Sequence, residues 1–264
     1  MKKALIILAL AGAMAAVPAA ADWDPGDPAK WVQIPDLTTS GMDVNATAPM
    51  TLADDFLCDT TGPITDIHLW GSWKDDLLPA GGAGNVIFHL SILASALISG
   101  GGANQVPGPV IWQQEFCPGE FAFRPYAENL QEGWYDPDTG GYIWPGDTVC
   151  WQYNFTVPDT NPCTQQGDAA VPATYYLAVS ATPCDPAAQF GWKTAVTPVN
   201  GRLSAAEPPD LPIEMFYPDG PLENAAFDLA FVIAPEPVSA SILGLGAMAL
   251  LRRRRQSLSN RGRD

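Results

Sequence analysis

The carboxylates and the two histidines are the side chains of this 264-residue sequence with the widest chemical range. A glycosidase needs two carboxylates on opposite sides of a cleft, one as acid and one as base or nucleophile. Acidic residues are so frequent here that such pairs select no site, and we expect most to be solvated turn residues. We therefore predict that the protein is not an enzyme, and a secreted hydrolase is the second alternative. The candidates are Asp54, Asp55, Asp66, Asp75, Asp76, Glu115, Glu120, Asp136, Asp138 and Asp147.

His68 and His89 could act as metal ligands or bases, but spacing places no third ligand or nucleophile beside them. Both fall on the polar side of runs in which apolar residues alternate. We expect them to face solvent or to form hydrogen bonds. The sequence predicts no metal site on them and no cofactor.

The segment DPDTGG, from Asp136 to Gly141, offers oxygen ligands on a tight turn. Asp136, Asp138 and a carbonyl could supply three of the six or more oxygens that calcium takes, but the glutamate that closes an EF-hand loop is missing. Pro137 and Gly140 favour a simple hairpin turn. Calcium binding near Asp136 and Asp138 stays open at this point.

Nine tryptophans give the chain rings that stack on sugars when they are exposed. Trp70, Trp73 and Trp134 lie near predicted turns and are the candidates for sugar stacking, although packing in the core or at its rim is the competing interpretation. Trp151 falls on the apolar face of its strand and is expected in the core. A module that binds carbohydrate, namely exopolysaccharide, is therefore the first alternative function.

Five cysteines leave at least one thiol unpaired. Disulfides form in oxidising compartments, and five cysteines allow fifteen ways of making two pairs. Cys163 and Cys184 flank one predicted strand, so we expect them to form the first disulfide. No spacing indicates a zinc site.

Period-two alternation of apolar residues predicts the elements that must position these side chains. The clearest runs are 86–92, 148–157, 174–181 and 226–233, and no segment has a convincing helical period. With the weaker candidates, about ten strands follow one another at the spacing of a sandwich. We predict one all-β domain, a β-sandwich or jelly-roll-like fold, over residues 22–233. The weaker runs are 31–34, 64–73, 110–116, 121–126, 142–144 and 215–217.

The charge of the central region excludes some partners. Residues 22–235 carry five basic against 27 acidic residues, a formal charge of −22. Such a surface repels phosphate backbones and anionic lipid. We expect no nucleic-acid partner, and contact with a membrane only through the C-terminal segment before processing.

The N-terminus has the features of a secretory signal peptide over residues 1–21, which we expect to form a signal helix. Lys2 and Lys3 precede an apolar run, and small residues end at Ala21, so we predict cleavage between Ala21 and Asp22. The partners implied are the Sec export machinery and signal peptidase.

Residues 234–255 read APEPVSASILGLGAMALLRRRR. The 14 apolar residues before the arginines would form a helix of ~21 Å, shorter than a ~30 Å hydrocarbon core. The arginines hold the segment on the cytoplasmic side. Residues 256–264 would then form a cytoplasmic tail.

Pro235, Glu236 and Pro237, the short hydrophobic helix and the arginines together resemble the PEP-CTERM sorting signal of Gram-negative bacteria. The resemblance implies recognition by exosortase, a membrane protease that removes the tail and passes the protein to the cell envelope or the extracellular matrix. The four arginines are Arg252, Arg253, Arg254 and Arg255.

The central motifs KWVQIPDLTTSGMDV, LADDFLCDTTGPITDIHLWGSW, YYLAVSA, FGWKT and FDLAFVI resemble an uncharacterised β-rich domain of PEP-CTERM proteins in planctomycete-like bacteria. That family brings no assigned catalytic or binding residue. We therefore expect an exported protein of the cell surface or matrix with a structural or interaction role, anchored transiently in the inner membrane.

Overall fold

A computed structural model describes residues 22–97, 105–196, 203–205, 213–219 and 222–235 of the chain. The predicted signal peptide, with Ala21, lies outside the described residues. So does the predicted tail from Glu236 onward, with Pro237 and the four arginines. The two predicted terminal helices therefore cannot be compared with the structure. Within the described part of the chain, no helix is both long enough and apolar enough to cross a membrane.

The described residues form fifteen β-strands and one short 3-10 turn, η1 (Lys74–Asp76). The strands are β1 (Trp31–Gln33), β2 (Met42–Asn45), β3 (Leu52–Cys58), β4 (Gly62–Ile64), β5 (Asp66–Trp73), β6 (Val86–Leu97), β7 (Gln105–Phe116), β8 (Ala122–Asp136), β9 (Gly141–Thr156), β10 (Cys163–Gln165), β11 (Ala173–Pro183), β12 (Phe190–Lys193), β13 (Leu203–Ala205), β14 (Ile213–Glu214) and β15 (Phe231–Ala234). The all-β prediction is confirmed.

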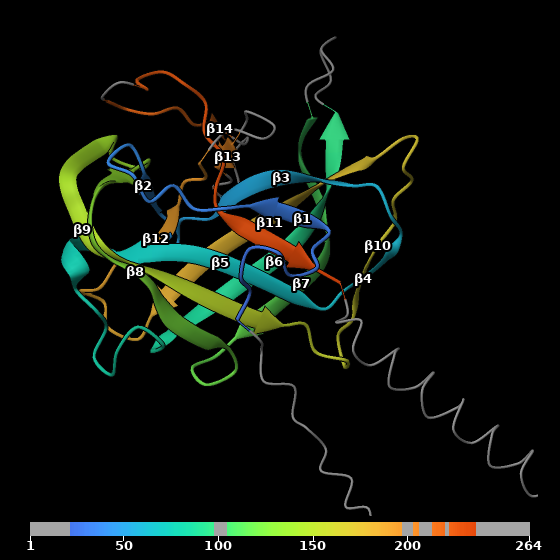
Figure 1. Ribbon diagram of the computed structural model, residues 1–264, viewed down its shortest axis with the longest axis horizontal. Helices are drawn as coiled ribbons and strands as arrows, with labels where there is room; N and C mark the ends of the chain where they lie inside the picture. The colour runs from blue at the N-terminus through green and yellow to red at the C-terminus, as the bar shows by residue number, and fades with distance from the viewer. Residues whose placement is uncertain (1–21, 98–104, 197–202, 206–212, 220–221, 236–264) are drawn as a thin grey trace, which may run out of the picture.

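Two large sheets account for most of the domain (Figure 1). One has seven strands in the order β1-β15-β5-β12-β2-β8-β9, and the other has six in the order β14-β13-β3-β11-β6-β7. Strands β4 and β10 form a separate pair. The sequence predicted about ten strands because several strands of two to four residues are too short for alternation to be visible.

The main core lies between the two large sheets. Val86, Phe88, Leu90 and Ile92 of β6 are fully buried there, as their alternation predicts. The Phe88 ring lies 5.0 Å from the ring of Tyr153, which reaches it from β9 in the opposite sheet. Aromatic contacts of this kind join the two sheets across the core.

The second face of β9 is also buried, which the alternation did not predict. Cys150, Gln152 and Asn154 point away from the main core but are not exposed to solvent. The first described residues lie over them: Asn154 Nδ2 donates a 2.9 Å hydrogen bond to Asp22, and Gln152 Nε2 donates one of 2.7 Å to the carbonyl of Trp23. This segment therefore encloses a second, smaller apolar cluster beneath it.

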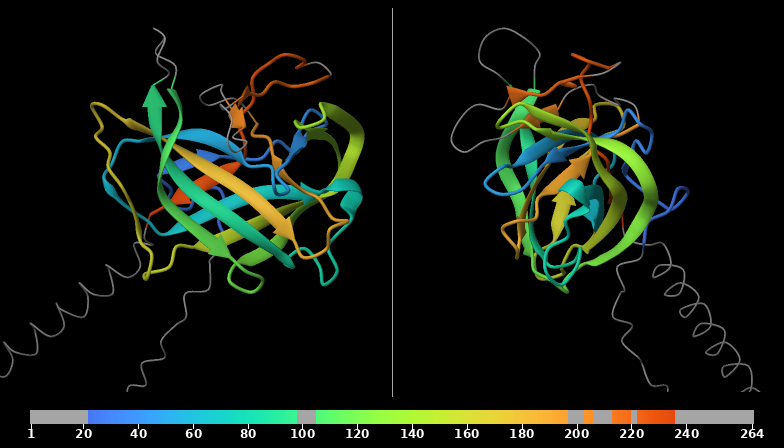
Figure 2. Two further views of the ribbon diagram at one scale, coloured as in Figure 1. Left: turned by 180° about the vertical axis from the view of Figure 1, so that it is seen from behind. Right: turned by 90° about the vertical axis from the view of Figure 1, so that its left-hand side faces the viewer.

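Five strands of the seven-stranded sheet close into a ring. Strand β5 pairs with β12, β12 with β2, β2 with β8, β8 with β9, and β9 returns to β5. Three register shifts along β8 and β9 allow these long strands to bend through the required angle (Figure 2). The side chains that the ring encloses are buried.

Candidate functional site

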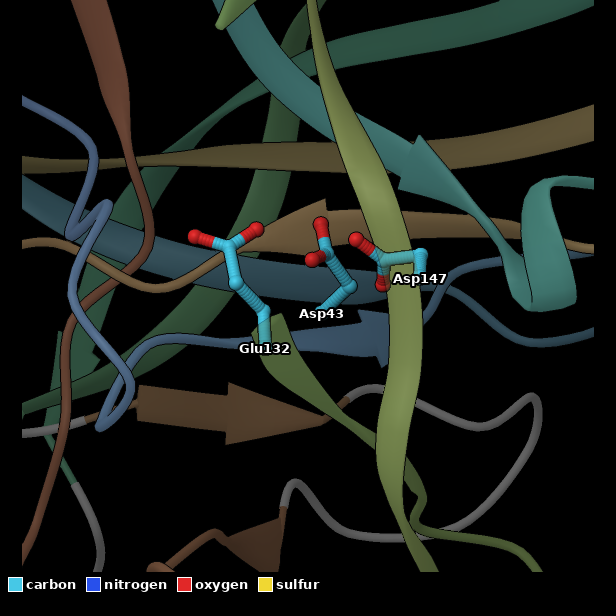
Figure 3. A group of neighbouring side chains, drawn as sticks. All are labelled: Asp43, Glu132 and Asp147. Carbon is cyan, nitrogen blue, oxygen red and sulfur yellow. The ribbon is translucent and has the colours of Figure 1, made fainter. Parts of the chain in front are cut away.

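The ring brings together four charged side chains, each from a different strand. Asp43 lies on β2, Glu132 on β8, Asp147 on β9 and Lys193 on β12. Their positions follow from strand register, since Lys193 lies opposite Asp43 and Glu132 lies opposite Asp147. Figure 3 shows the three carboxylates converging within the ring. We refer to these four residues as the ring cluster.

Contacts within the ring cluster are direct. Lys193 Nζ donates a 2.8 Å hydrogen bond to Asp43 Oδ2 and also pairs with the Glu132 carboxylate. One oxygen from each of the three carboxylates lies within 4.8 Å of the others. Asp43, Glu132 and Lys193 have no exposed surface, and Asp147 is 2% exposed. These are among the residue types that are least often buried.

The ring cluster cannot keep all three of its carboxyl groups ionised. Three carboxylates and one ammonium would place two net negative charges in an environment that solvates them poorly. Burial raises the pKa of Asp43, raises that of Glu132 to about 7 and raises that of Asp147 to about 9. Burial lowers the pKa of Lys193, but the negative charges of Asp43 and Glu132 raise it by more, so the ammonium is retained. Protons on the carboxyl groups therefore neutralise the cluster.

Hydrogen bonding requires the same protons. With every carboxyl group ionised, Asp43 Oδ1, Glu132 Oε1 and both oxygens of Asp147 have no donor. Asp147 and Ser72 face the Asp43 carboxylate. A proton on Asp147 turns its carboxyl group into a donor toward Asp43. The resting arrangement is thus an ammonium, an ionised carboxylate and at least one neutral acid in contact.

Three converging carboxylates resemble the oxygen set of a divalent cation. Here the Lys193 ammonium already contacts two of the three and supplies the positive charge. The structure therefore favours an internal ion pair at this position.

The predicted sugar-stacking residues are all buried, which corrects that prediction. Trp70 and Trp73 have no exposed surface, and Trp134 is 1% exposed. Trp70 packs edge-on against Trp23, and Trp73 Nε1 donates a 3.0 Å hydrogen bond to the Tyr153 hydroxyl. Their proximity to turns suggested exposure, but both faces of this sheet are covered.

The two histidines lie apart from the ring cluster. His68 is buried on β5, its Nδ1 lies 2.7 Å from Asn154 Oδ1, and burial lowers its pKa. His89 is exposed on β6 and lies 3.4 Å from the Glu115 carboxylate. The expectation that they form hydrogen bonds or face solvent is confirmed.

The Asp136–Gly141 segment is the hairpin turn between β8 and β9, with Asp136 opposite Gly141. The Asp136 carboxylate accepts hydrogen bonds from the Asp138 amide and the Thr139 hydroxyl, and Gly140 adopts a φ of 67°. The turn interpretation is confirmed. These bonds use the Asp136 oxygens that calcium would require.

All five cysteines are free thiols, so the structure does not contain the predicted Cys163–Cys184 disulfide. Cys163 is buried on β10, and Cys184 is exposed after the end of β11. The strand between them separates the two residues instead of bringing them together.

Sequence reasoning included Asp147 among the acidic candidates but missed Asp43, Glu132 and Lys193. One signal was available: only five basic residues lie between positions 22 and 235, and Lys193 stands between Trp192 and Thr194. A lysine in so acidic and apolar a setting needs a buried partner. The identity of that partner depends on the closure of the ring, which no local pattern encodes.

Residues 29–234 match a family described as a domain of unknown function, DUF7901. No curated protein and no solved structure matches the chain. The matched range begins just before β1 and ends with β15, so it includes both large sheets and every residue of the ring cluster. The chain therefore belongs to the DUF7901 family.

Proposed function

We propose that this protein is an exported structural component of the cell envelope or extracellular matrix. A signal peptide directs it through the Sec machinery, and exosortase removes its C-terminal sorting segment. The DUF7901 domain is the part that stays outside the cell. The observation that carries the proposal is the position of the two ends of this domain.

Both predicted processing sites adjoin the same end of the domain. Asp22, the first residue after the predicted signal cleavage, is bonded to Asn154, which lies opposite His68 of β5. Ala234, the last residue of β15, lies opposite Asp66 of the same strand. The described chain thus begins and ends on one side of the domain (Figure 1).

This arrangement suits a protein that two membrane proteases process. With both ends on one side, the folded domain can face away from the membrane while each cleavage site remains near it. Pro235 follows β15 directly, and proline resists helix formation, so we expect an extended backbone at this residue. The strongly acidic central region also suits a soluble exported domain.

The two alternative functions, carbohydrate binding and hydrolysis, need accessible side chains, and the candidate residues that the structure brings together are buried. The three tryptophans proposed to stack on exopolysaccharide are buried. The carboxylates that do converge lie inside the ring, where a polysaccharide chain has no access. Buried groups can stabilise the fold, which suits a structural role. Catalytic groups must instead be open to the substrate.

Mass spectrometry of envelope material from the native host tests the proposal. We expect a mature protein that begins at Asp22 and lacks the mass of its C-terminal tail. Glu236→Ala, or replacement of Arg252–Arg255 by glutamine, should leave an uncut precursor in the inner membrane or release the tail unprocessed. A mature surface protein that extends to Asp264 would show that the tail is an anchor and would reject processing by exosortase.

A further inference from the structure

We propose that Lys193 and Asp43 form an intramolecular amide bond, which covalently links strands β12 and β2 inside the ring. The inference goes beyond the proposed function and does not depend on it. It rests on the contact geometry of the ring cluster and on the chemistry of an amine held against a carboxyl group in the absence of water.

The two reacting groups are already in place. Lys193 Nζ lies 2.8 Å from Asp43 Oδ2, and the two residues are directly opposite each other on neighbouring strands. Well-oriented groups within one molecule react as if the effective concentration were about 10⁵–10⁸ M. Neither group has any exposed surface, so no bulk water competes with the amine.

The bond forms by condensation, without an oxidant or an external reagent. A proton moves from the Lys193 ammonium to the Asp43 carboxylate, which gives a neutral amine and a neutral acid. The Nζ lone pair attacks Asp43 Cγ, and the Nζ–Cγ bond forms. One Cγ–O bond then breaks, and that oxygen leaves as water with one proton from the acid and one from the amine. The product is an amide, and two opposite charges disappear from the interior.

Glu132 and Asp147 are placed to assist both halves of this reaction. The Glu132 carboxylate contacts Lys193 Nζ, so it can take a proton from the attacking nitrogen and return it to the leaving oxygen. Burial raises the pKa of Glu132 to about 7, which suits a group that both accepts and donates a proton. Asp147, protonated at neutral pH, faces Asp43 and can stabilise the oxygen on which negative charge develops.

The position of the bond gives it a mechanical consequence. Asp43 and Lys193 lie 150 residues apart in the chain, and their strands have only four residues each. A covalent link would prevent the ring from opening between β2 and β12.

Intact mass spectrometry of the full-length chain, denatured and reduced, tests the proposal. We expect a mass lower than the sequence mass by one water molecule. Digestion with trypsin should yield a branched peptide that joins the segments around Asp43 and Lys193, with no cleavage after Lys193. The matched control is Lys193→Arg, which keeps the charge but cannot form this bond and should have its full sequence mass.

Two variants identify the acyl group and the proton shuttle. Asp43→Asn should still react but lose ammonia in place of water, since the leaving group is then the amide nitrogen. Glu132→Gln should abolish or greatly slow the reaction while circular dichroism stays β-type. A wild-type chain of full sequence mass would overturn the proposal. So would a loss of water that persists in Lys193→Arg or Asp43→Asn, since the water would then come from another residue.

Discussion

Glu132 and Asp147 lie directly opposite each other on β8 and β9, and both are buried. Two ionised carboxylates in this relation repel, and the low-dielectric interior strengthens the repulsion. The pair is therefore stable only while at least one of the two carries a proton.

Stability should consequently fall as the pH rises. Burial raises the pKa of Glu132 from 4.5 to about 7 and that of Asp147 from 3.8 to about 9. Between the unfolded and folded values the folded state binds more protons, so the free energy of unfolding decreases with increasing pH. We expect a continuous decrease from about pH 4 to about pH 9. Urea denaturation at a series of pH values measures it.

Asp147→Asn provides the matched control for this pH dependence. Asparagine has nearly the same shape and cannot ionise, so the variant should keep its stability up to a higher pH than the wild type. An unchanged pH profile in the variant would mean that Asp147 is not the group responsible.

In a chain in which Lys193 and Asp43 have not condensed, removing the single positive charge of the ring cluster should be costly. Lys193→Met keeps most of the side-chain volume but leaves three carboxyl groups around an apolar chain. Breaking a buried ion pair by deleting one partner costs about 3–5 kcal/mol. We expect a loss of that size in the free energy of unfolding at pH 7, and a smaller loss at pH 5, where more of the carboxyl groups are protonated. Equal losses at the two pH values would contradict the charge argument.

The sequence predicted the main core well because its residues follow a local rule. Alternation identified Phe88 and its neighbours on β6, and this face packs against the opposite sheet. Alternation could not show that the other face of β9 is covered too, because residues 22–23 come from a distant part of the chain. The same limit explains the ring cluster, since Asp43 and Lys193 lie on four-residue strands that only tertiary closure brings together.

The tryptophans provide a direct comparison between a buried and an exposed ring. Trp134 fits where Gly146 and Gly191 leave room, since a Cβ at either glycine would lie within 2.6 Å of Trp134 atoms. Truncating a buried tryptophan to alanine costs about 3–5 kcal/mol. Trp134→Ala should lose that much stability, whereas Trp144→Ala, at a ring that is 51% exposed, should stay within about 0.5 kcal/mol of the wild type. Chemical denaturation measures the free energy of unfolding of the two variants. Similar losses would contradict the argument that burial sets the contribution of each tryptophan.

Trp23 links the predicted position of signal cleavage to the stability of the fold. Its ring is 4% exposed and packs edge-on against Trp70, with ring centroids 5.9 Å apart. Its carbonyl accepts the hydrogen bond from Gln152 that covers the second face of β9. Cleavage between Ala21 and Asp22 keeps all of these contacts, whereas cleavage beyond Trp23 would remove them.

Trp23→Ala should therefore destabilise the domain by about 3–5 kcal/mol, the range measured for buried tryptophans. Val171→Ala, at a side chain that is 76% exposed, is the control and should change stability by less than about 0.5 kcal/mol. N-terminal sequencing of the exported protein completes the test, because a stable domain must begin at or before Asp22. An exported, folded protein that starts after Trp23 would show that this segment is dispensable, and the link between cleavage position and folding would be lost.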